Sequence, residues 1–395
     1  MQTLADRIMR MDESATIAMA RRSRELAATG VNVISLSLGE PDFDTPEFIK
    51  EAAIKAIQEN YSHYTPIAGY ADLREAICKK FARDNQLHYS PDEIVVSTGA
   101  KQSILNVVMA LVNPGDEVIL PTPYWVSYAE MVRLAEGEAV FIPTTVEQEY
   151  KFTAAQLEAA ITPKSKLMIF SNPCNPSGAV YNEQELQAIA EVIEKHPQLY
   201  VVSDEIYELI RFEGKHVSLA ALGNIRDQVI TVNGLSKGFA MTGWRLGYLG
   251  ASKEVAKACD KLQGQVTSAP NSITQRAAIT ALAADPSVVD FMKDAFFQRR
   301  QMVLELCNAI PGFRNHLPGG AFYLFPDVSH WLGRELNGTW IETSSDLCLY
   351  LLDQAHVGLV PGDAFGNPNS LRISYAASEE DLKEAMRRLA KVLIE

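Results

Sequence analysis

The stretch NGLSKGFAMTGWRLGY (233–248) carries only two cations, Lys237 and Arg245, and surrounds them with small, apolar and aromatic residues. It follows the apolar run VITVN (229–233) and ends in RLGYLG (245–250), so it joins two segments that we expect to be strands. Removing a cation from water costs free energy unless an anion or a hydrogen-bond acceptor receives it. The stretch therefore predicts a polar site at a strand end, whose other members come from elsewhere in the chain.

Short apolar runs are candidate strands, and longer segments with a helical spacing of apolar residues lie between several of them. The other runs are EIVVS (93–97), EVIL (117–120), AVFIP (139–143), KLMIF (166–170) and LYVVS (199–203). Strands that are apolar throughout are typical of an α/β fold, in which helices cover both faces of a mostly parallel sheet. Ligands of such sheets bind at the carboxyl ends of the strands.

The chain of 395 residues is long enough for two domains. Its last hundred residues combine a helical run at 287–309 with strand-like segments, which predicts a smaller α+β domain. We expect an N-terminal segment (1–45) that contributes to the small domain and to the functional site. A large domain (46–285) and the small C-terminal domain (286–395) follow it.

Composition and charge argue against several classes of protein. The net charge of −13 is unlike that of a general nucleic-acid binder. No run approaches the roughly 18 apolar residues that a membrane helix needs. The N-terminal sequence MQTLADRIMRMDES lacks a signal-peptide pattern, so we expect a cytoplasmic protein that binds no membrane. The five cysteines and seven histidines are scattered without metal-ligand spacing, so we expect no metal site.

Three further polar clusters follow candidate strands. STGAKQ (97–102) precedes a helix at 103–112, and its free backbone N–H groups would bind an anion, although an ordinary turn has the same pattern. SNPCNPSG (171–178) contains two Asn-Pro pairs, which form a rigid turn able to present Asn175 to the strand ends. SDEIYE (203–208) places Asp204 after an apolar strand with Tyr207 three residues on, and a helix-capping role for Asp204 is the alternative.

Together, the clusters supply a nucleophile, an acid, hydrogen-bond donors and an anion-binding turn. A desolvated lysine such as Lys237 has a lowered pKa and acts as a nucleophile or base. The planar guanidinium of Arg245 suits a phosphate or a carboxylate. Pyridoxal phosphate needs this set of groups: a Schiff-base lysine, an acid for the pyridine nitrogen, donors to the phenolate oxygen and ligands for the phosphate. The clusters therefore predict a pyridoxal phosphate site.

Motifs spread over nearly the whole chain have the pattern of one enzyme family. They are LGEPDFDTP (38–46), HYTPIAGYADLREAI (63–77), STGAKQ, PTPYWVSY (121–128), NPCNPSG, SDEIY, LSKGFAMTGWRLGY, GGAFY (319–323), PGDAFG (361–366) and LRISYA (371–376). The most specific of them are SDEIY and the combination of SK with GWR. Through these motifs the chain resembles the class I/II aminotransferases, which are pyridoxal phosphate enzymes of fold type I. The pattern is most similar to the bacterial Iβ branch of aspartate aminotransferases.

The resemblance implies a role for each polar residue around the cofactor ring. Lys237 would form the Schiff base, and Asp204 would pair with the pyridinium nitrogen. Tyr207 and Asn175 would donate hydrogen bonds to the phenolate oxygen, while Trp125 would stack on the ring.

The resemblance also implies where the cofactor phosphate binds. Ser236, Arg245 and the turn of Gly99 and Ala100 would hold it. Tyr64 resembles a tyrosine that reaches the phosphate of the neighbouring subunit, so the resemblance implies a homodimer with shared active sites.

Two groups of residues would bind the carboxylates of an amino acid substrate. The resemblance assigns the α-carboxylate to Arg372, helped by Gly39, Trp125 and Asn175. It assigns the side-chain carboxylate to Lys101, which also counts among the cofactor-binding residues, with help from Ser14 and Thr16. A solvated lysine at the start of a helix is the alternative interpretation of Lys101.

At two places the sequence departs from the family pattern. Many relatives have a serine shortly before the Schiff-base lysine, where this chain has Gly234, so one phosphate hydrogen bond is missing or supplied elsewhere. Relatives that use prephenate often have a basic residue just before the serine of the Ser-Ala-Thr segment. This chain has Asp12 and Glu13 there, which makes prephenate a less favoured substrate.

The resemblance implies transamination between L-aspartate and 2-oxoglutarate by a ping-pong cycle through the Schiff base. The same fold and cofactor residues would also serve aromatic amino acids, alanine, or prephenate and arogenate. A carbon–sulfur lyase of the same fold is a further alternative. A transcription regulator that senses an effector would need a DNA-binding module, and no basic extension of that size precedes residue 30.

Overall fold

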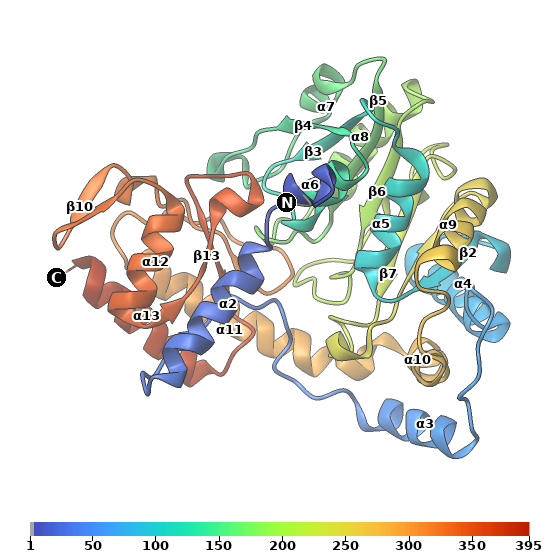
Figure 1. Ribbon diagram of the computed structural model, residues 1–395, viewed down its shortest axis with the longest axis horizontal. Coiled ribbons are helices and arrows are strands. Elements are labelled where there is room, and N and C mark those ends of the chain that lie inside the picture. The colour runs from blue at the N-terminus through green and yellow to red at the C-terminus, as the bar shows by residue number, and fades with distance from the viewer. Residues whose placement is uncertain (1–3, 395) are drawn as a thin grey trace.

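A computed structural model describes residues 4–394 and has a seven-stranded sheet as its largest element (Figure 1). The strand order is β2-β8-β7-β6-β5-β3-β4. Of these strands, β8 alone runs antiparallel to its neighbours, so the mostly parallel sheet predicted from the apolar runs is confirmed. The strands are β2 (Ile94–Ser97), β3 (Glu117–Pro121), β4 (Glu138–Ile142), β5 (Ser165–Ser171), β6 (Tyr200–Asp204), β7 (Val229–Gly234) and β8 (Gly247–Gly250).

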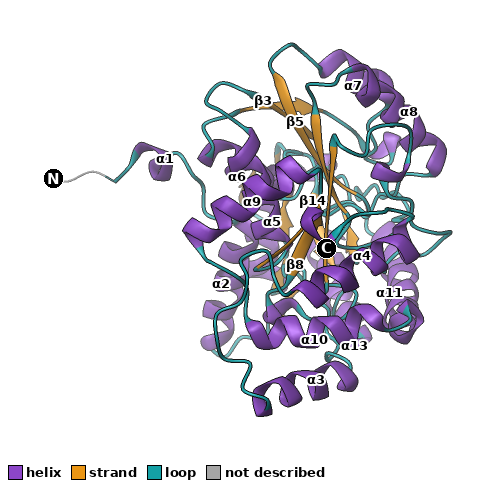
Figure 2. Cartoon of the chain, turned by 90° about the vertical axis from the view of Figure 1, so that its right-hand side faces the viewer, coloured by secondary structure: helices purple, strands orange, loops and turns teal. Residues whose placement is uncertain are grey.

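Alternate side chains of the central strands enter two separate cores. In β5, Leu167 and Ile169 pack in one core with helices α5, α6 and α9, while Met168 and Phe170 pack in the other with α8. Figure 2 shows these two sets of helices on opposite sides of the strands. Because both faces are covered, the strands are apolar throughout rather than alternating. The helices around the sheet are α3 (Glu47–Gln58), α4 (Ala71–Asn85), α5 (Ala100–Leu111), α6 (Ser127–Leu134), α7 (Ala154–Ala160), α8 (Glu183–Lys195), α9 (Lys253–Val266) and α10 (Ser272–Ala283).

The C-terminal part of the chain forms smaller sheets packed with helices. The helix expected at 287–309 begins as a short 3-10 turn and continues as α11 (Asp290–Asn308). A three-stranded sheet has the order β13-β14-β9, and β10 pairs with β11. The remaining elements here are β9 (Tyr323–Leu324), β10 (Arg334–Leu336), β11 (Thr339–Ile341), α12 (Ser344–Ala355), β12 (Val357–Gly358), β13 (Val360–Pro361), β14 (Leu371–Ser374) and α13 (Glu379–Ile394).

The N-terminal segment packs against this C-terminal part. Strand β1 (Ile34–Ser35) pairs in parallel with β12, and α2 (Ala15–Ala28) lies beside the C-terminal elements (Figure 1). The short helix α1 (Asp6–Met9) contacts α6 instead. The segment therefore touches both parts of the molecule, while the predicted boundaries at 45/46 and 285/286 stay a prediction. None of the helices in residues 4–394 is both long enough and apolar enough to cross a membrane.

The parallel strands bring the polar clusters to one edge of the large sheet. Strands β5, β6 and β7 run in the same direction and end at Ser171, Asp204 and Gly234. Strand β2 ends at Ser97, three residues before α5 begins at Ala100. The carboxyl ends of these strands therefore form the base of one site.

Candidate active site

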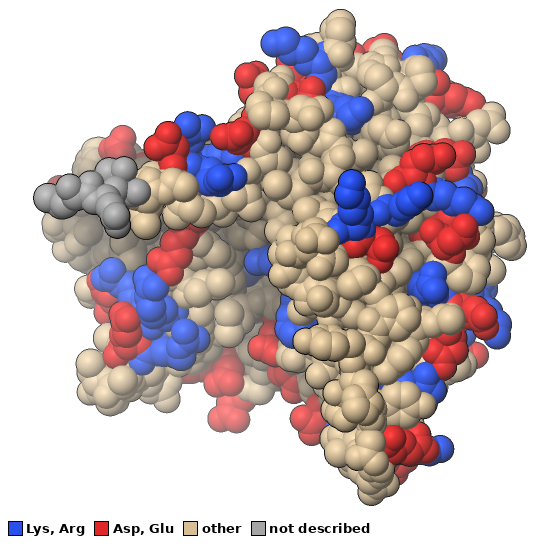
Figure 3. Space-filling model, turned by 45° about the vertical axis from the view of Figure 1, so that its right-hand side comes forward, with Lys and Arg blue, Asp and Glu red and all other residues tan. Residues whose placement is uncertain are grey.

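A cavity of about 240 Å³ lies at this edge of the sheet. Of the site residues predicted from the sequence, all except Gly99 and Tyr64 line it. Four cations, Lys101, Lys237, Arg245 and Arg372, face a single carboxylate, that of Asp204. Figure 3 shows basic side chains inside a hollow of the molecular surface. Because the positive charges outnumber the negative one, the cavity favours anionic ligands.

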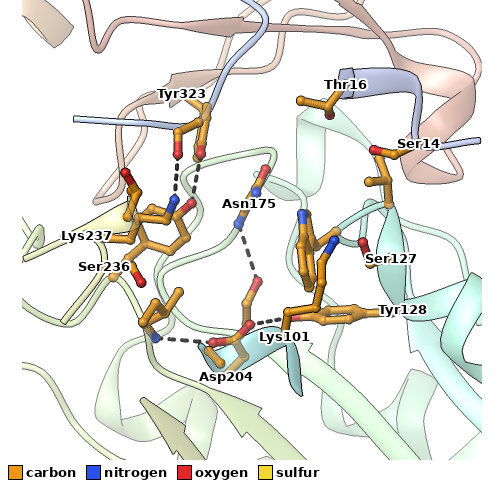
Figure 4. Close-up of a pocket in the computed structure, with 18 of the residues that line it drawn as sticks. Ser14, Thr16, Lys101, Ser127, Tyr128, Asn175, Asp204, Ser236, Lys237 and Tyr323 are labelled. Carbon is orange, nitrogen blue, oxygen red and sulfur yellow. Dashed lines mark hydrogen bonds between the residues drawn. The ribbon is translucent and has the colours of Figure 1, made fainter. Parts of the chain in front are cut away.

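Asp204 is the buried acid at the base of the cavity (Figure 4). Its carboxylate accepts hydrogen bonds from the hydroxyl of Tyr128 (2.7 Å) and from the backbone N–H of Ile206 (3.3 Å). A turn, not an α-helix, follows β6, so the helix-capping interpretation of Asp204 is wrong. Burial raises the pKa of Asp204 to about 6 although the Tyr128 hydrogen bond opposes the rise. A cation placed beside this carboxylate would relieve the cost of its burial.

Lys237 lies across the cavity from Asp204, with its Nζ donating a hydrogen bond to the carbonyl oxygen of Gly39 (2.5 Å). Burial lowers the pKa of Lys237 to about 8, and the charges of Arg372 and Arg245 add to this effect. The neutral amine, which a nucleophile or a general base requires, is therefore much more accessible near pH 7 than in an ordinary lysine.

Arg372 is buried and reaches the cavity from β14. Its guanidinium donates to Oδ1 of Asn175 (2.9 Å) and to the carbonyl oxygen of Ser37 (2.5 Å), and Nε has no partner in the described residues. These acceptors are neutral, so the positive charge of Arg372 stays uncompensated by them. A buried guanidinium in this state suits a carboxylate ligand.

The first turn of α5 faces Arg245 across Gly99. The N-terminus of a helix presents free N–H groups to an anion, and Ser236 places a hydroxyl in the same wall of the cavity. A Cβ atom at Gly99 would lie 2.4 Å from Nη2 of Arg245, so the glycine permits this close approach. The arrangement of helix N-terminus, hydroxyl and guanidinium fits a phosphate group. In the single chain Arg245 is exposed, so its charge is not yet removed from water.

The packing of Gly234 explains why no serine stands there. A Cβ atom at this position would lie 2.9 Å from the carbonyl oxygen of Leu246 and 3.1 Å from the Cα atom of Gly247. Strands β7 and β8 therefore approach too closely for any side chain at Gly234. Gly247 is restricted in the same way, because its Cβ atom would lie 2.2 Å from the backbone nitrogen of Ala100.

The outer wall of the cavity contains Lys101, Trp125, Ser14 and Thr16 (Figure 4). Nζ of Lys101 lies 4.9 Å from the ring centroid of Trp125. Lys101 is exposed at the mouth of the cavity, but partial desolvation together with the charge of Arg245 lowers its pKa. The hydroxyl of Thr16 is buried and has no hydrogen-bond partner within residues 4–394. A free cation next to an unpartnered hydroxyl can receive a second anionic group.

Tyr64 does not reach the cavity of the single chain. Its side chain is 99% exposed, which leaves it free to contact another molecule.

The structure adds residues that our sequence analysis did not assign to the site. Tyr128 contacts Asp204, and the hydroxyl of Tyr323 lies 2.8 Å from that of Tyr207. Thr242 also lines the cavity. All three residues stand in the family motifs, Tyr128 in PTPYWVSY, Tyr323 in GGAFY and Thr242 in LSKGFAMTGWRLGY, so the sequence carries a signal for each of them.

A second polar cluster lies behind Asp204. Potential metal-ligand atoms of Glu205, Glu208 and His216 lie within 4.8 Å of one another. The ammonium of Lys80 forms an ion pair with Glu208 and a hydrogen bond with Asn85 (2.6 Å), so a cation of the chain itself already pairs with one of the two carboxylates. Burial opposes ionisation of Glu208, but the charges of Lys80 and His216, together with hydrogen bonds from Lys80 and Asn85, outweigh it and lower the pKa of Glu208. The expected absence of a metal stays a prediction.

Replacing Lys80 by methionine is expected to lower the free energy of unfolding by about 3–5 kcal/mol, because Glu208 would keep a buried, unpaired charge. The loss can be measured as a lower urea midpoint of the cofactor-free protein. Lys383→Met is the matched control, since Lys383 pairs with Glu379 on an exposed helix face and contributes about 0.5 kcal/mol or less. Equal midpoints for the two variants would contradict the prediction.

Comparisons with known proteins show the family of this chain. Residues 31–389 match the family described as aminotransferase class I and II. A "Bifunctional aspartate aminotransferase and glutamate/aspartate-prephenate aminotransferase" of Petunia hybrida is 47% identical over 99% of this chain and 83% of the relative. A crystal structure of the aspartate aminotransferase of Rhizobium meliloti has a TM-score of 0.96 at 42% identity and covers 100% of this chain and 99% of that one.

A solved structure of the aspartate aminotransferase of Thermus thermophilus with maleate has a TM-score of 0.93 at 41% identity, and the match covers both chains completely (100% each). A family match over most of the chain, a buried acid opposite a lysine, and an anion-binding helix N-terminus thus agree with one another. This chain belongs to the aminotransferase class I and II family and is a pyridoxal phosphate-dependent aminotransferase.

Proposed function

We propose that this enzyme transfers the amino group between L-aspartate and 2-oxoglutarate in a ping-pong cycle. The observation that carries the proposal is the set of four cations around a single carboxylate in the cavity. The cofactor phosphate would neutralise Arg245, and the cofactor aldehyde would be linked to the amine of Lys237. Arg372 and Lys101 then remain for the two carboxylates of a dicarboxylic substrate. The solved structure of the Thermus thermophilus aspartate aminotransferase with maleate, a dicarboxylate, supports this distribution.

The cofactor would bind along the base of the cavity. Pyridoxal phosphate supplies an aldehyde that links to amines and a ring that takes up the electrons left when a Cα proton is removed. Asp204 would hold the proton on the ring nitrogen, which keeps the ring able to accept those electrons. Ser236, Arg245 and the first turn of α5 would bind the phosphate, and Trp125 would stack on the ring.

Lys237 would move the proton at the reacting carbon. Once the substrate amine has displaced it, its neutral amine is free to take the Cα proton and to return it at the neighbouring carbon of the cofactor. The lowered pKa of Lys237, about 8, favours this neutral form. Tyr207 and Asn175 would donate hydrogen bonds to the phenolate oxygen, since both line the same part of the cavity.

Arg372 would bind the α-carboxylate of the substrate together with Asn175, to which it is already hydrogen-bonded. Gly39 and Trp125 would complete this part of the wall. The second carboxylate would reach Lys101 and the unpartnered hydroxyl of Thr16, with Ser14 beside it.

The proposal is tested by adding single amino acids to the protein reconstituted with pyridoxal phosphate. Aspartate and glutamate are expected to abolish the visible absorbance of the cofactor linked to Lys237, whereas alanine and phenylalanine leave most of it in place. Release of pyruvate and ammonia from a cysteine-like substrate, without that absorbance change, would identify a carbon–sulfur lyase instead. A response to phenylalanine or alanine at least as fast as that to aspartate would overturn the choice of substrate.

Replacing Lys101 by methionine is expected to lower kcat/KM for aspartate by about 10–100-fold, because a hydrogen bond to a charged group contributes roughly 1.5–3 kcal/mol. The rate with alanine, which has no second carboxylate, is expected to stay unchanged. Steady-state kinetics with both substrates measure the difference, and Lys391→Met on the exposed face of α13 is the control. If both substrates lose rate equally, Lys101 acts on the cofactor and not on the side-chain carboxylate.

Prephenate is a second candidate substrate, because the Petunia hybrida relative is also a glutamate/aspartate-prephenate aminotransferase. The segment before Ser14 argues against it here. Asp12 pairs with Arg133 (3.0 Å) and Glu13 with Arg21 (2.6 Å), so this segment offers acidic groups with bound partners and not a free cation. Adding prephenate to the amino form of the enzyme tests this directly, and rapid recovery of the visible absorbance would establish prephenate as a substrate.

We also propose that the enzyme is a cytoplasmic homodimer with shared active sites. The fully exposed Tyr64 and the exposed apolar side chains Ile54 and Ile57 of α3 support a contact with a second chain. In this arrangement Tyr64 of each chain would reach the phosphate of the other. Sedimentation of a monomer at micromolar concentration would contradict it.

A further inference from the structure

Tyr323 and Tyr207 form a pair of buried hydroxyls at the cavity wall (Figure 4). Their oxygen atoms are 2.8 Å apart, and either hydroxyl could be the donor. Tyr323 comes from β9 of the small C-terminal sheet, whereas Tyr207 follows β6 of the large sheet. A hydroxyl has one proton, so the direction of this hydrogen bond decides whether the proton of Tyr207 is available to a ligand.

The surroundings of Tyr323 make it the better donor of the two. The guanidinium carbon of Arg372 lies 4.6 Å from the ring centroid of Tyr323, so a positive charge stabilises partial negative charge on this phenol. Burial raises the pKa of both tyrosines and the charge of Arg372 opposes the rise at both, but the pKa of Tyr207 still rises well above its ordinary value, and Arg372 ranks higher among the causes at Tyr323. Between two hydrogen-bonded phenols, the more acidic one donates.

Gly39 leaves the space that the hydroxyl of Tyr323 occupies beside Tyr207. A Cβ atom at Gly39 would lie 2.1 Å from the Tyr323 oxygen, so any other residue at position 39 would displace the hydroxyl. The ring of Tyr323 is also held on its other side by Phe322, with ring centroids 4.8 Å apart. Its hydroxyl is therefore fixed between the backbone of Gly39 and Tyr207.

We propose that Tyr323 is a positioning residue that donates its proton to Tyr207 and thereby directs the proton of Tyr207 toward the phenolate oxygen of the cofactor. A phenol that accepts a hydrogen bond becomes a stronger donor. The pair thus strengthens the hydrogen bond from Tyr207 to the phenolate oxygen. A phenolate stabilised in this way attracts the proton on the nitrogen that links Lys237 to the cofactor less strongly, so the pKa of that linkage falls. Arg372, Lys237 and Asp204 are the charged groups that face the pair. The inference rests on the proposed role of Tyr207 and does not depend on the choice of amino acid substrate.

The test is a pH titration of the visible absorbance of the enzyme reconstituted with pyridoxal phosphate, which reports protonation of the Lys237–cofactor linkage. Tyr323→Phe removes only the hydroxyl and is expected to raise the linkage pKa by about 0.5, since it weakens one neutral hydrogen bond. Tyr207→Phe is expected to raise it further, because the donor itself is lost. In the double variant the pKa is expected to equal that of Tyr207→Phe, because Tyr323 acts through Tyr207.

Tyr375→Phe is the matched control for loss of a buried hydroxyl. Tyr375 donates to the carbonyl oxygen of Ala321 (3.3 Å) and does not line the cavity, so its linkage pKa is expected to match that of the unmodified enzyme. An unchanged pKa in Tyr323→Phe, or additive shifts in the double variant, would overturn the inference. An unchanged pKa in Tyr207→Phe would instead reject the proposed role of Tyr207.

Discussion

Replacing Lys237 by alanine is expected to lower kcat for aspartate by about 10⁴-fold or more. The proposed mechanism asks this one amine to carry the cofactor linkage and then to move the Cα proton, and proton transfer by a positioned group alone contributes roughly 10²–10⁴-fold. The structure offers no substitute at that point, because Lys237 faces Gly39 and the ring of Tyr207, neither of which is a base near pH 7. Single-turnover absorbance measurements with aspartate give the rate.

Lys237→Arg separates the charge of the residue from its chemistry. Arginine keeps a cation in the cavity but is not deprotonated in proteins, so it is expected to be as inactive as alanine. Retention of more than about 1% of the activity by either variant would contradict the role of Lys237 as the base, because a positioned base contributes at least about 10²-fold.

Replacing Asp204 by alanine is expected to leave cofactor binding in place and to lower kcat by about 10³-fold. Breaking a buried ion pair costs roughly 3–5 kcal/mol. Without Asp204 the protonated ring nitrogen is destabilised by this amount, and the barrier of the reaction rises because the protonated ring must accept electrons. Phosphate contacts from Ser236 and Arg245 would still hold the cofactor. Equilibrium dialysis gives the binding, stopped-flow absorbance gives the rate, and near-normal turnover would reject the assignment of Asp204.

Unfolding measurements distinguish this loss of rate from a loss of folding. In the cofactor-free protein the pKa of Asp204 is raised from its ordinary value of 3.8 to about 6. The fold therefore loses stability as the pH rises between these two values, and the full loss remains above pH 6. Removing the carboxylate is therefore expected to leave the urea midpoint at pH 8 unchanged or higher. Asp260→Ala on α9 is the control for deleting an aspartate outside the cavity, with an expected change in kcat of about twofold or less.

Much of the fold could be predicted because its signals are local. Apolar runs of four to six residues mark strands covered on both faces, and all seven runs coincide with strands of one sheet. Polar residues directly after those runs then had to meet, since parallel strands end at the same edge. This is why Asp204, Asn175 and Lys237 could be placed in one site before the structure was known.

Other parts of the site could not be predicted, because they depend on partners far apart in the chain. Tyr207 and Tyr323 are 116 positions apart, and Arg372 and Asn175 are 197 apart. Nothing in the local sequence specifies these hydrogen bonds. Gly234 is a similar case, since only the approach of β8 to β7 leaves no space for a side chain there.

By itself, the sequence determined the class of fold, the family and the chemical groups available to the cofactor, because backbone preference and burial leave periodic patterns in the residues. The tertiary structure alone decided how those groups are paired and charged. It gives Arg372 only neutral hydrogen-bond acceptors among the described residues, which contain no hydrogen-bond partner for the hydroxyl of Thr16. It also places the hydroxyl of Tyr323 within hydrogen-bond distance of Tyr207. The physical reason is that hydrogen bonds and electrostatic interactions depend on distances of a few ångströms, which only packing between distant segments establishes.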